Sequence, residues 1–325
     1  NDHRLGAQEA PPAIVSMFLG SQLEDVVEQI VDKGVAAEHL SGGKLNTGVS
    51  TVPVLDADAT DRNRTSPFAF TGNKFEFRMV GSSDSIAMPN TTLNAVVAEA
   101  FCDAADVLEK SENFAEDCKK YIAETMKAHK RIVFNGDGYS DEWVAEAARR
   151  GLPNIHSMVE ATSALTTKSA VTLFEKFGIF TKAELQAREE IAYEGYAKNI
   201  NIEAQTMIHM AGKKYVPAVV KYTTMLAESI NSVKTACPAA DISVQQELLV
   251  RVSSLLTEAQ SALAALTETT AKVNAIEETK AMAFGFHTDV VPAMARLRKA
   301  VDELELIVDK SVWPVPTYGD LMFEV

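Results

Sequence analysis

Five consecutive residues, Lys74-Phe75-Glu76-Phe77-Arg78, alternate between charged and aromatic side chains. Because successive side chains of a β-strand point to opposite faces, this alternation predicts a strand with one charged face and one buried, apolar face. The three charges span roughly 13 Å along such a strand. Two interpretations fit: a solvated ladder of surface ion pairs, or a site whose carboxylate binds a hard cation such as Mg²⁺ while the basic groups hold phosphate oxygens.

Two further short strings carry charged residues next to residues that interrupt helices and strands. Arg4-Leu5 is followed by Glu9-Ala10-Pro11, and Asn63-Arg64-Thr65 comes directly after Gly42–Asp61, a stretch rich in Gly, Thr, Pro and Asp. The prolines and the polar composition predict loops for both strings. Taken singly, an arginine or a glutamate in a loop is most often exposed and without a role. The order of the strings along the chain is the more specific signal.

In that order, the strings resemble glutamine synthetases, and in particular their long type III branch. The family carries Arg-Leu with Glu-Ala-Pro shortly behind, then Asn-Arg-Ser/Thr, then a basic-x-Glu-x-Arg strand. A Pro-Asn or Asn-Pro step then opens a helix, as Pro89-Asn90 does here. Phe177–Tyr196 is similar to the closing helices of the family. The resemblance covers residues 1–205 and implies that the chain is the C-terminal part of a longer enzyme.

The resemblance implies an ATP-dependent ligase that joins ammonium to L-glutamate, by way of γ-glutamyl phosphate, to give L-glutamine, ADP and phosphate. By the same resemblance, Glu76 corresponds to a ligand of an active-site Mg²⁺ or Mn²⁺. Lys74 and Arg64 correspond to basic residues on the ATP side of the site. The implied enzyme is cytoplasmic and works as a homo-oligomeric ring with active sites at subunit boundaries, and this chain alone is expected to be inactive.

Four site residues follow from the family motifs. Arg4 resembles the arginine that pairs with the α-carboxylate of glutamate, a task suited to a bidentate guanidinium. Glu9 resembles the catalytic flap glutamate that closes over the intermediate and helps deprotonate ammonium. Arg64 and Arg78 resemble the catalytic arginines that stabilise the phosphoryl group in transfer.

The departures from the short enzymes of the family define the expected domains. An inserted segment at residues 12–62 separates two motifs that those enzymes place almost side by side. Ala69 stands where they have a nucleotide-binding arginine, so the contacts to ATP must differ. We therefore expect an α+β fold: residues 1–205 as the C-terminal part of the catalytic domain, with a few antiparallel strands covered by helices, and 206–325 as an all-helical extension ending in an apolar tail.

Helix signals dominate after the charged strand. Apolar residues at helical spacing predict a helix over 15–33 that stops at Gly34. Capping boxes are predicted at Thr181 with Glu184 and at Ser243 with Gln246, and Asp289 is expected to cap a helix that tolerates Pro292 in its first turn. A second set of apolar residues recurs in steps of three and four, the pattern of a coiled-coil seam: Leu249, Val252, Leu256, Ala259, Leu263 and Leu266.

This seam is expected to pack in an antiparallel hairpin against a later helix, and the tail after it is expected to lie extended on a surface. The later helix presents its own apolar residues: Met294, Leu297, Val301, Leu304 and Val308. The seam also supports a rival hypothesis, a mostly helical oligomerisation module without catalysis of its own. The rival would leave Glu76 and Arg78 on an outer face, whereas the enzyme requires them in one cleft with Arg4 and Arg64.

Composition narrows the classes of partner. Of the 325 residues, 46% are hydrophobic and 23% are charged, which is ordinary for a globular protein. The net charge of −14 disfavours nucleic acid and acidic membranes as partners. The three cysteines lack the spacing of metal ligands and are expected to be free thiols.

Overall fold

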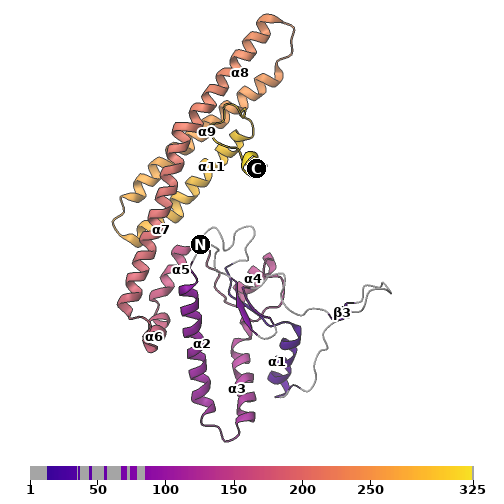
Figure 1. Cartoon of the computed structure of the whole chain (residues 1–325), viewed down its shortest axis with the longest axis vertical. Coiled ribbons are helices and arrows are strands. Elements are labelled where there is room, and N and C mark those ends of the chain that lie inside the picture. The colour runs from indigo at the N-terminus through magenta and orange to yellow at the C-terminus, as the bar shows by residue number, and fades with distance from the viewer. Residues whose placement is uncertain are drawn as a thin grey trace. The chain divides into compact units, whose positions relative to one another are not determined.

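The computed structural model describes residues 13–34, 36, 44–45, 55–56, 67–71, 74–78 and 85–323, without the side chains of 44–45, 55–56 and 323. Arg4, Glu9 and Arg64 lie outside the described residues. The chain forms two compact units, Asn1–Leu185 and Gln186–Val325, and the division falls within one helix. Together they make an α+β protein with a small sheet and many helices, as predicted (Figure 1).

The first unit contains a three-stranded sheet in the order β1 (Met17–Phe18), β4 (Phe68–Phe70) and β5 (Phe75–Phe77). The β4–β5 pair is antiparallel, and so is a separate pair of β2 (Lys44–Leu45) and β3 (Leu55–Asp56). In contrast to the antiparallel expectation, β1 and β4 run parallel. Parallel neighbours need a crossover connection, and this one contains a helix.

The helix predicted over 15–33 begins later than expected. Its first residues form β1, and α1 spans Ser21–Lys33. Gly20, at φ 80°, turns the chain between strand and helix, and Gly34, at φ 75°, ends the helix as predicted. The side-chain oxygen of Asn135 accepts hydrogen bonds from the amides of Leu19 and Gly20, both at 2.9 Å, and so fixes this turn.

Helices account for most of the other described residues of the first unit. The described helices are α2 (Ala87–Leu108), α3 (Phe114–His129), α4 (Asp141–Arg149), α5 (Met158–Thr162), α6 (Lys168–Lys176) and the 3₁₀ turns η1 (Lys130–Ile132) and η2 (Ser163–Thr166). Pro89-Asn90 lies in the first turn of α2, as predicted. Trp143 of α4 is buried and stacks on Phe134 with ring centroids 3.7 Å apart, and the Phe134 amide donates to the Met17 carbonyl oxygen. This core therefore joins α4 to the edge of the sheet.

The second unit is built from long helices (Figure 1). In chain order they are α7 (Lys182–Met210), η3 (Ala211–Tyr215), α8 (Val216–Ala236), α9 (Ser243–Asn274), α10 (Thr279–Gly285), η4 (Phe286–Val290), α11 (Val291–Glu305) and α12 (Tyr318–Phe323). The segments α7, η3 and α8 follow one another without a break, as do α10, η4 and α11. The long α9 packs against both α8 and α11.

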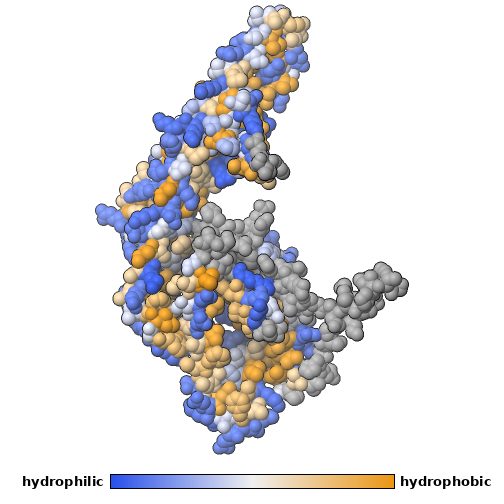
Figure 2. Space-filling model, in the orientation of Figure 1, coloured by the Kyte–Doolittle hydropathy of each residue, from blue (hydrophilic) through white to orange (hydrophobic). Residues whose placement is uncertain are grey.

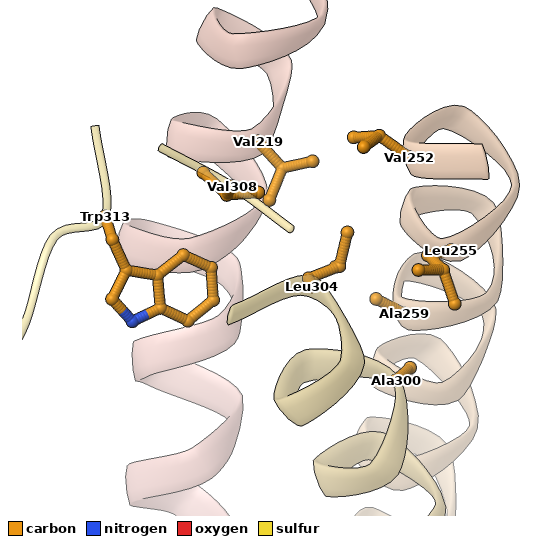
Figure 3. Close-up of a cluster of buried hydrophobic side chains, with 8 residues drawn as sticks. All are labelled: Val219, Val252, Leu255, Ala259, Ala300, Leu304, Val308 and Trp313. Carbon is orange, nitrogen blue, oxygen red and sulfur yellow. The ribbon is translucent and has the colours of Figure 1, made fainter. Parts of the chain in front are cut away.

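The predicted seam on α9 is confirmed as largely buried, with Leu249 and Leu256 only partly buried. Val252, Ala259 and Leu266 are at most 1% exposed, and Leu304 of α11 meets this face in one apolar cluster (Figure 3). The expected hairpin of α9 and α11 therefore forms, with Val219 of α8 completing the cluster. Fully burying each such valine or leucine side chain contributes about 1.5–3 kcal/mol relative to exposure.

One of the two predicted capping boxes is confirmed. The Thr181 amide donates to Glu184 Oε2 at 2.8 Å, and the Glu184 amide donates to Thr181 Oγ1 at 3.3 Å. The box at Ser243 with Gln246 is wrong. Asp241 accepts the Ser243 amide at 2.9 Å instead, because an Asx side chain two residues upstream reaches this N–H first.

Two π-helical segments, η3 and η4, each end at a Val-Pro step. The Val216 amide donates to the Ala211 carbonyl and the Val291 amide to the Phe286 carbonyl, each bond spanning five residues. Proline has no N–H and clashes with the carbonyl four residues before it, so the wider turn accommodates Pro217 within a continuing helix. The prediction that Asp289 caps a new helix is therefore wrong, because the chain is already helical there.

Apolar side chains are exposed on α2, where Val96, Val97, Phe101 and Val107 are between 46% and 71% accessible. Orange colour is widespread in the first unit in Figure 2, whereas blue and orange are interspersed on the long helices of the second unit. None of the described helices combines the length and apolar character needed to span a membrane.

Candidate active-site strand

The strand β5 carries the charged face that the alternation predicts, but its aromatic face is not buried as expected, because Phe75 is 45% exposed. Phe75 and Phe77 pack on the phenylalanine face of β4, with the Phe68 and Phe75 rings stacked at 5.1 Å. The opposite face presents Lys74, Glu76 and Arg78 in a row. The pleat of the hairpin thus separates an aromatic surface from a row of three ionisable groups.

The backbone around β5 fixes the ends of this row. The Arg78 amide donates to the Pro67 carbonyl at 2.8 Å, and the Thr71 amide donates to the Lys74 carbonyl at 2.8 Å. Between these bonds, Glu76 pairs directly with Ala69 of β4. Side chains at paired positions lie about 5 Å apart, so Glu76 has a buried methyl group rather than another charge as its cross-strand neighbour.

Lys74 and Arg78 each contact the carboxylate of Glu76. Arg78 donates two hydrogen bonds to Glu76 Oε2, from Nε at 3.2 Å and from Nη2 at 3.0 Å. Lys74 Nζ lies 3.4 Å from the other oxygen, Oε1. Side-chain exposure falls from 65% at Lys74 through 38% at Glu76 to 17% at Arg78, so the guanidinium is the most enclosed member. The ion-pair ladder and the predicted chemical cluster are thus the same three residues.

The cluster favours an ionised Glu76. Its pKa lies below the ordinary value of 4.5, first because Arg78 donates hydrogen bonds to the carboxylate and then because Lys74 does. A carboxylate offers about four acceptor positions, so these contacts leave room on Glu76 for a cation. The donor chemistry therefore fits one oxygen ligand of Mg²⁺ or Mn²⁺. Among the described residues, no three His, Cys, Asp or Glu side chains gather closely enough to form a complete metal site.

We expect Arg78→Gln to raise the pKa of Glu76 towards 4.5, because the largest cause of its depression is removed. Lys74→Gln should raise it less. Because the folded-state pKa is the lower one, the stabilisation that these bonds give is present above the unfolded pKa and is lost as pH falls through the folded one. Carboxyl ¹³C NMR titration of glutamate-labelled protein measures the midpoint.

Arg149→Gln is the matched control for that titration. Arg149 is the first cause of the depressed pKa of Glu146, which lies at about 2. The control should therefore raise the Glu146 midpoint and leave that of Glu76 in place. An unchanged Glu76 midpoint in Arg78→Gln would show that the pair does not persist in solution.

The structure brings together Lys74, Glu76 and Arg78 among the predicted site residues. The predicted convergence of Arg4 and Arg64 on the same cleft, and the position of Glu9, concern residues outside the described part and stay predictions. Asn135, for which the sequence predicts no role, holds the β1–α1 turn and donates to Glu24. No local pattern signals that role, because its partners lie more than 100 positions away.

The chain as a whole is similar to known proteins. Residues 117–234 match the family described as glutamine synthetase C-terminal domain. A type-3 glutamine synthetase from Dictyostelium discoideum is 38% identical over 99% of this chain, and the match covers 45% of that relative. The chain is similar to glutamine synthetases. A glutamine synthetase from Bacteroides fragilis is 36% identical over 99% of the chain and is covered to 46%.

A third relative, a glutamine synthetase from Butyrivibrio fibrisolvens, is 36% identical over 100% of the chain and is covered to 46%. The resemblance inferred from the short motifs is therefore confirmed, and it extends over nearly the whole chain rather than residues 1–205 alone. The chain spans about half the length of the curated glutamine synthetases that it matches.

Proposed function

We propose that this chain forms part of a glutamine synthetase that ligates ammonium to L-glutamate with ATP, by way of γ-glutamyl phosphate. The observation that carries the proposal is the Lys74–Glu76–Arg78 cluster on a rigid strand, in a chain similar to glutamine synthetases over almost all its length. Phosphoryl transfer needs a divalent cation and fixed positive charge around the phosphate oxygens. The cluster supplies one anionic oxygen ligand and two cations within one strand.

In this proposal Glu76 ligates Mg²⁺ or Mn²⁺, Lys74 lies on the ATP side, and Arg78 acts with Arg64 on the transferring phosphoryl group. The bound metal supplies Lewis-acid polarisation and neutralises phosphate charge. Arg78 holds Glu76 in its ionised form, and its own low exposure favours a defined orientation. The other ligands of the metal come from residues beyond the described part of the chain or from further polypeptide.

Arg4 and Glu9 complete the proposed site. Arg4 pairs with the α-carboxylate of glutamate through its guanidinium fork. Glu9 closes over the intermediate and removes a proton from ammonium, which frees the lone pair that attacks the acyl phosphate. Both roles rest on the family motifs alone.

The proposed domains keep the limits inferred from the motifs. Residues 1–205 are the C-terminal part of the catalytic domain, with an insertion at 12–62, and 206–325 are an extension specific to the type III branch. We place the full-length protein in the cytoplasm as a homo-oligomeric ring, and we expect the 325-residue chain to be inactive by itself.

The structure of the second unit weakens the support for the rival hypothesis, a helical oligomerisation module. Its support was the apolar seam on α9 as a surface for a partner. Most of that seam is covered by α8 and α11 of the same chain, with Val252 and Leu266 fully buried and Leu256 partly buried. The buried seam is thus part of an internal core rather than a free docking surface.

The full-length protein should form glutamine only when glutamate, ammonium, ATP and a divalent metal are all present. A chelator should abolish the activity, because the phosphates lose their counter-charge, and Mg²⁺ or Mn²⁺ should restore it. Glutamine and inorganic phosphate are measured in parallel and should appear in equal amounts. ATP hydrolysis without glutamine, or glutamine formation that survives chelation, would contradict the proposal.

A further inference from the structure

A cavity of about 190 Å³ opens in the second unit, between the end of α7, the π-segment η3, α11 and α12. Its floor is apolar and consists of Met207, Met210, Leu297 and Val301. Leu297 is 1% exposed, so the floor is continuous with the core. For scale, an engineered apolar cavity of about 150 Å³ binds benzene. The cavity can hold one small ring or a branched alkyl group.

The rim of the cavity carries one positive and one negative charge. Arg298 Nε donates to Asp302 Oδ2 at 3.3 Å, one helical turn further along α11. Arg298 Nη2 also donates to the Tyr318 hydroxyl, which in turn donates to Asp302 Oδ1 at 3.4 Å. Tyr318 belongs to α12, so the rim joins two helices.

Other contacts hold the rim in place without using the charged groups of Arg298 and Asp302. The Tyr318 amide donates to Glu305 Oε1 at 2.8 Å, and Lys310 forms an ion pair with Asp320. Tyr215, which also lines the cavity, stacks on the buried Trp313 with ring centroids 5.1 Å apart. The segment that returns to form α12 is thus anchored on both sides, which reduces the ordering cost of binding a ligand.

The charge pattern selects among ligands. A simple anion that pairs with Arg298 is repelled by the neighbouring Asp302, and a simple cation that pairs with Asp302 is repelled by Arg298. In each case the repulsion cancels part of the electrostatic attraction. A ligand that carries both charges on neighbouring atoms satisfies both groups. Within the described residues, Arg298 uses only Nε and Nη2 of its donors, which leaves N–H groups for a carboxylate.

We propose that this cavity binds a free α-amino acid with an apolar side chain. Its carboxylate accepts from Arg298, its ammonium donates to Asp302, and its side chain lies on the floor formed by Met207, Met210 and Val301. Glutamate fits poorly, because its second carboxylate has no cation on the apolar floor. The site belongs to the second unit and is independent of the β5 cluster in the first.

The test is calorimetric titration of the full-length protein with L-phenylalanine, L-leucine and L-methionine, without ATP. Saturable binding is expected for at least one of them. Two analogues of phenylalanine that each lack one charge, 3-phenylpropionate and 2-phenylethylamine, should bind about tenfold or more weakly, since each loses a charge-assisted hydrogen bond. Analogues that bind as well as the amino acid would overturn the proposal, as would the absence of saturable binding.

Variants locate the site. Arg298→Gln and Asp302→Asn should each weaken binding about tenfold or more, whereas Arg296→Gln, an exposed arginine on the same helix outside the cavity, should not. Val301→Phe fills the floor, leaves both rim charges in place and should abolish binding. Circular dichroism checks that each variant is folded. Binding retained in all three cavity variants belongs to another site and overturns the assignment.

Discussion

Glu76→Gln in the full-length protein is expected to lower the rate of glutamine formation at least about 100-fold. This loss of activity is larger than the loss expected when a residue that only orients a metal ligand is replaced. The substitution keeps the size of the side chain but replaces the anionic oxygen that would hold Mg²⁺ or Mn²⁺. Glu76 is 38% exposed and lies on the polar face of β5, so the fold should be retained. Steady-state assays over a range of Mn²⁺ concentrations measure the loss, and Mn²⁺ binding by electron paramagnetic resonance measures the affinity directly.

Glu116→Gln is the matched control for Glu76→Gln. Glu116 also forms an ion pair with a lysine, at 3.5 Å, but it lies on α3 and is 68% exposed. This substitution should leave both activity and Mn²⁺ affinity unchanged. Near-normal turnover of the Glu76→Gln enzyme would show that the β5 cluster is a surface ladder and that the metal is held elsewhere.

Leu304→Ala should destabilise the second unit by about 2–5 kcal/mol, the usual cost of removing a buried leucine side chain and leaving a cavity. Leu304 is 1% exposed and packs between α9 and α8, in the cluster that also holds Trp313 (Figure 3). Urea unfolding of the 325-residue chain, followed by Trp313 fluorescence, measures the change. A Trp143→Phe background removes the only other tryptophan of this chain.

Leu306→Ala is the control two residues away. Leu306 is 86% exposed, so its truncation should change the free energy of unfolding by no more than about 0.5 kcal/mol. Equal effects of the two substitutions would show that the cluster on α9 and α11 does not carry the stability of the unit.

The parts of the fold that follow from side-chain periodicity were predictable from the sequence. The seam on α9 repeats over several turns, so the pattern defines both the helix and its buried face. The short apolar run at Met17 and Phe18 fits a strand and a helix equally well, and the pairing with β4, some 50 residues away, decides between them. The cap at Ser243 failed because Asp241 competes for the same amide.

In the candidate site, too, the features that follow from side-chain periodicity were predictable, and those that depend on long-range packing were not. Alternation alone places Lys74, Glu76 and Arg78 on one face, because a strand has a fixed period of two. It does not reveal that Arg78 is enclosed while Lys74 is exposed, since exposure depends on what packs over each end of the strand. The cavity in the second unit was missed altogether. Its Arg298–Asp302 pair is visible as helical spacing, but the return of Tyr318 to that rim is not.

The two π-helical segments have a consequence for comparing this chain with its relatives. Each segment holds one residue more than an α-helix of the same rise, and one residue corresponds to about 100° of rotation. The apolar stripe before Ala211 is therefore out of phase with the stripe after Val216, although the helix continues. A relative that lacks one residue here could keep both faces of its core without a break in the helix. An alignment gap between residues 211 and 215 would thus mark a change of helical phase rather than a loop.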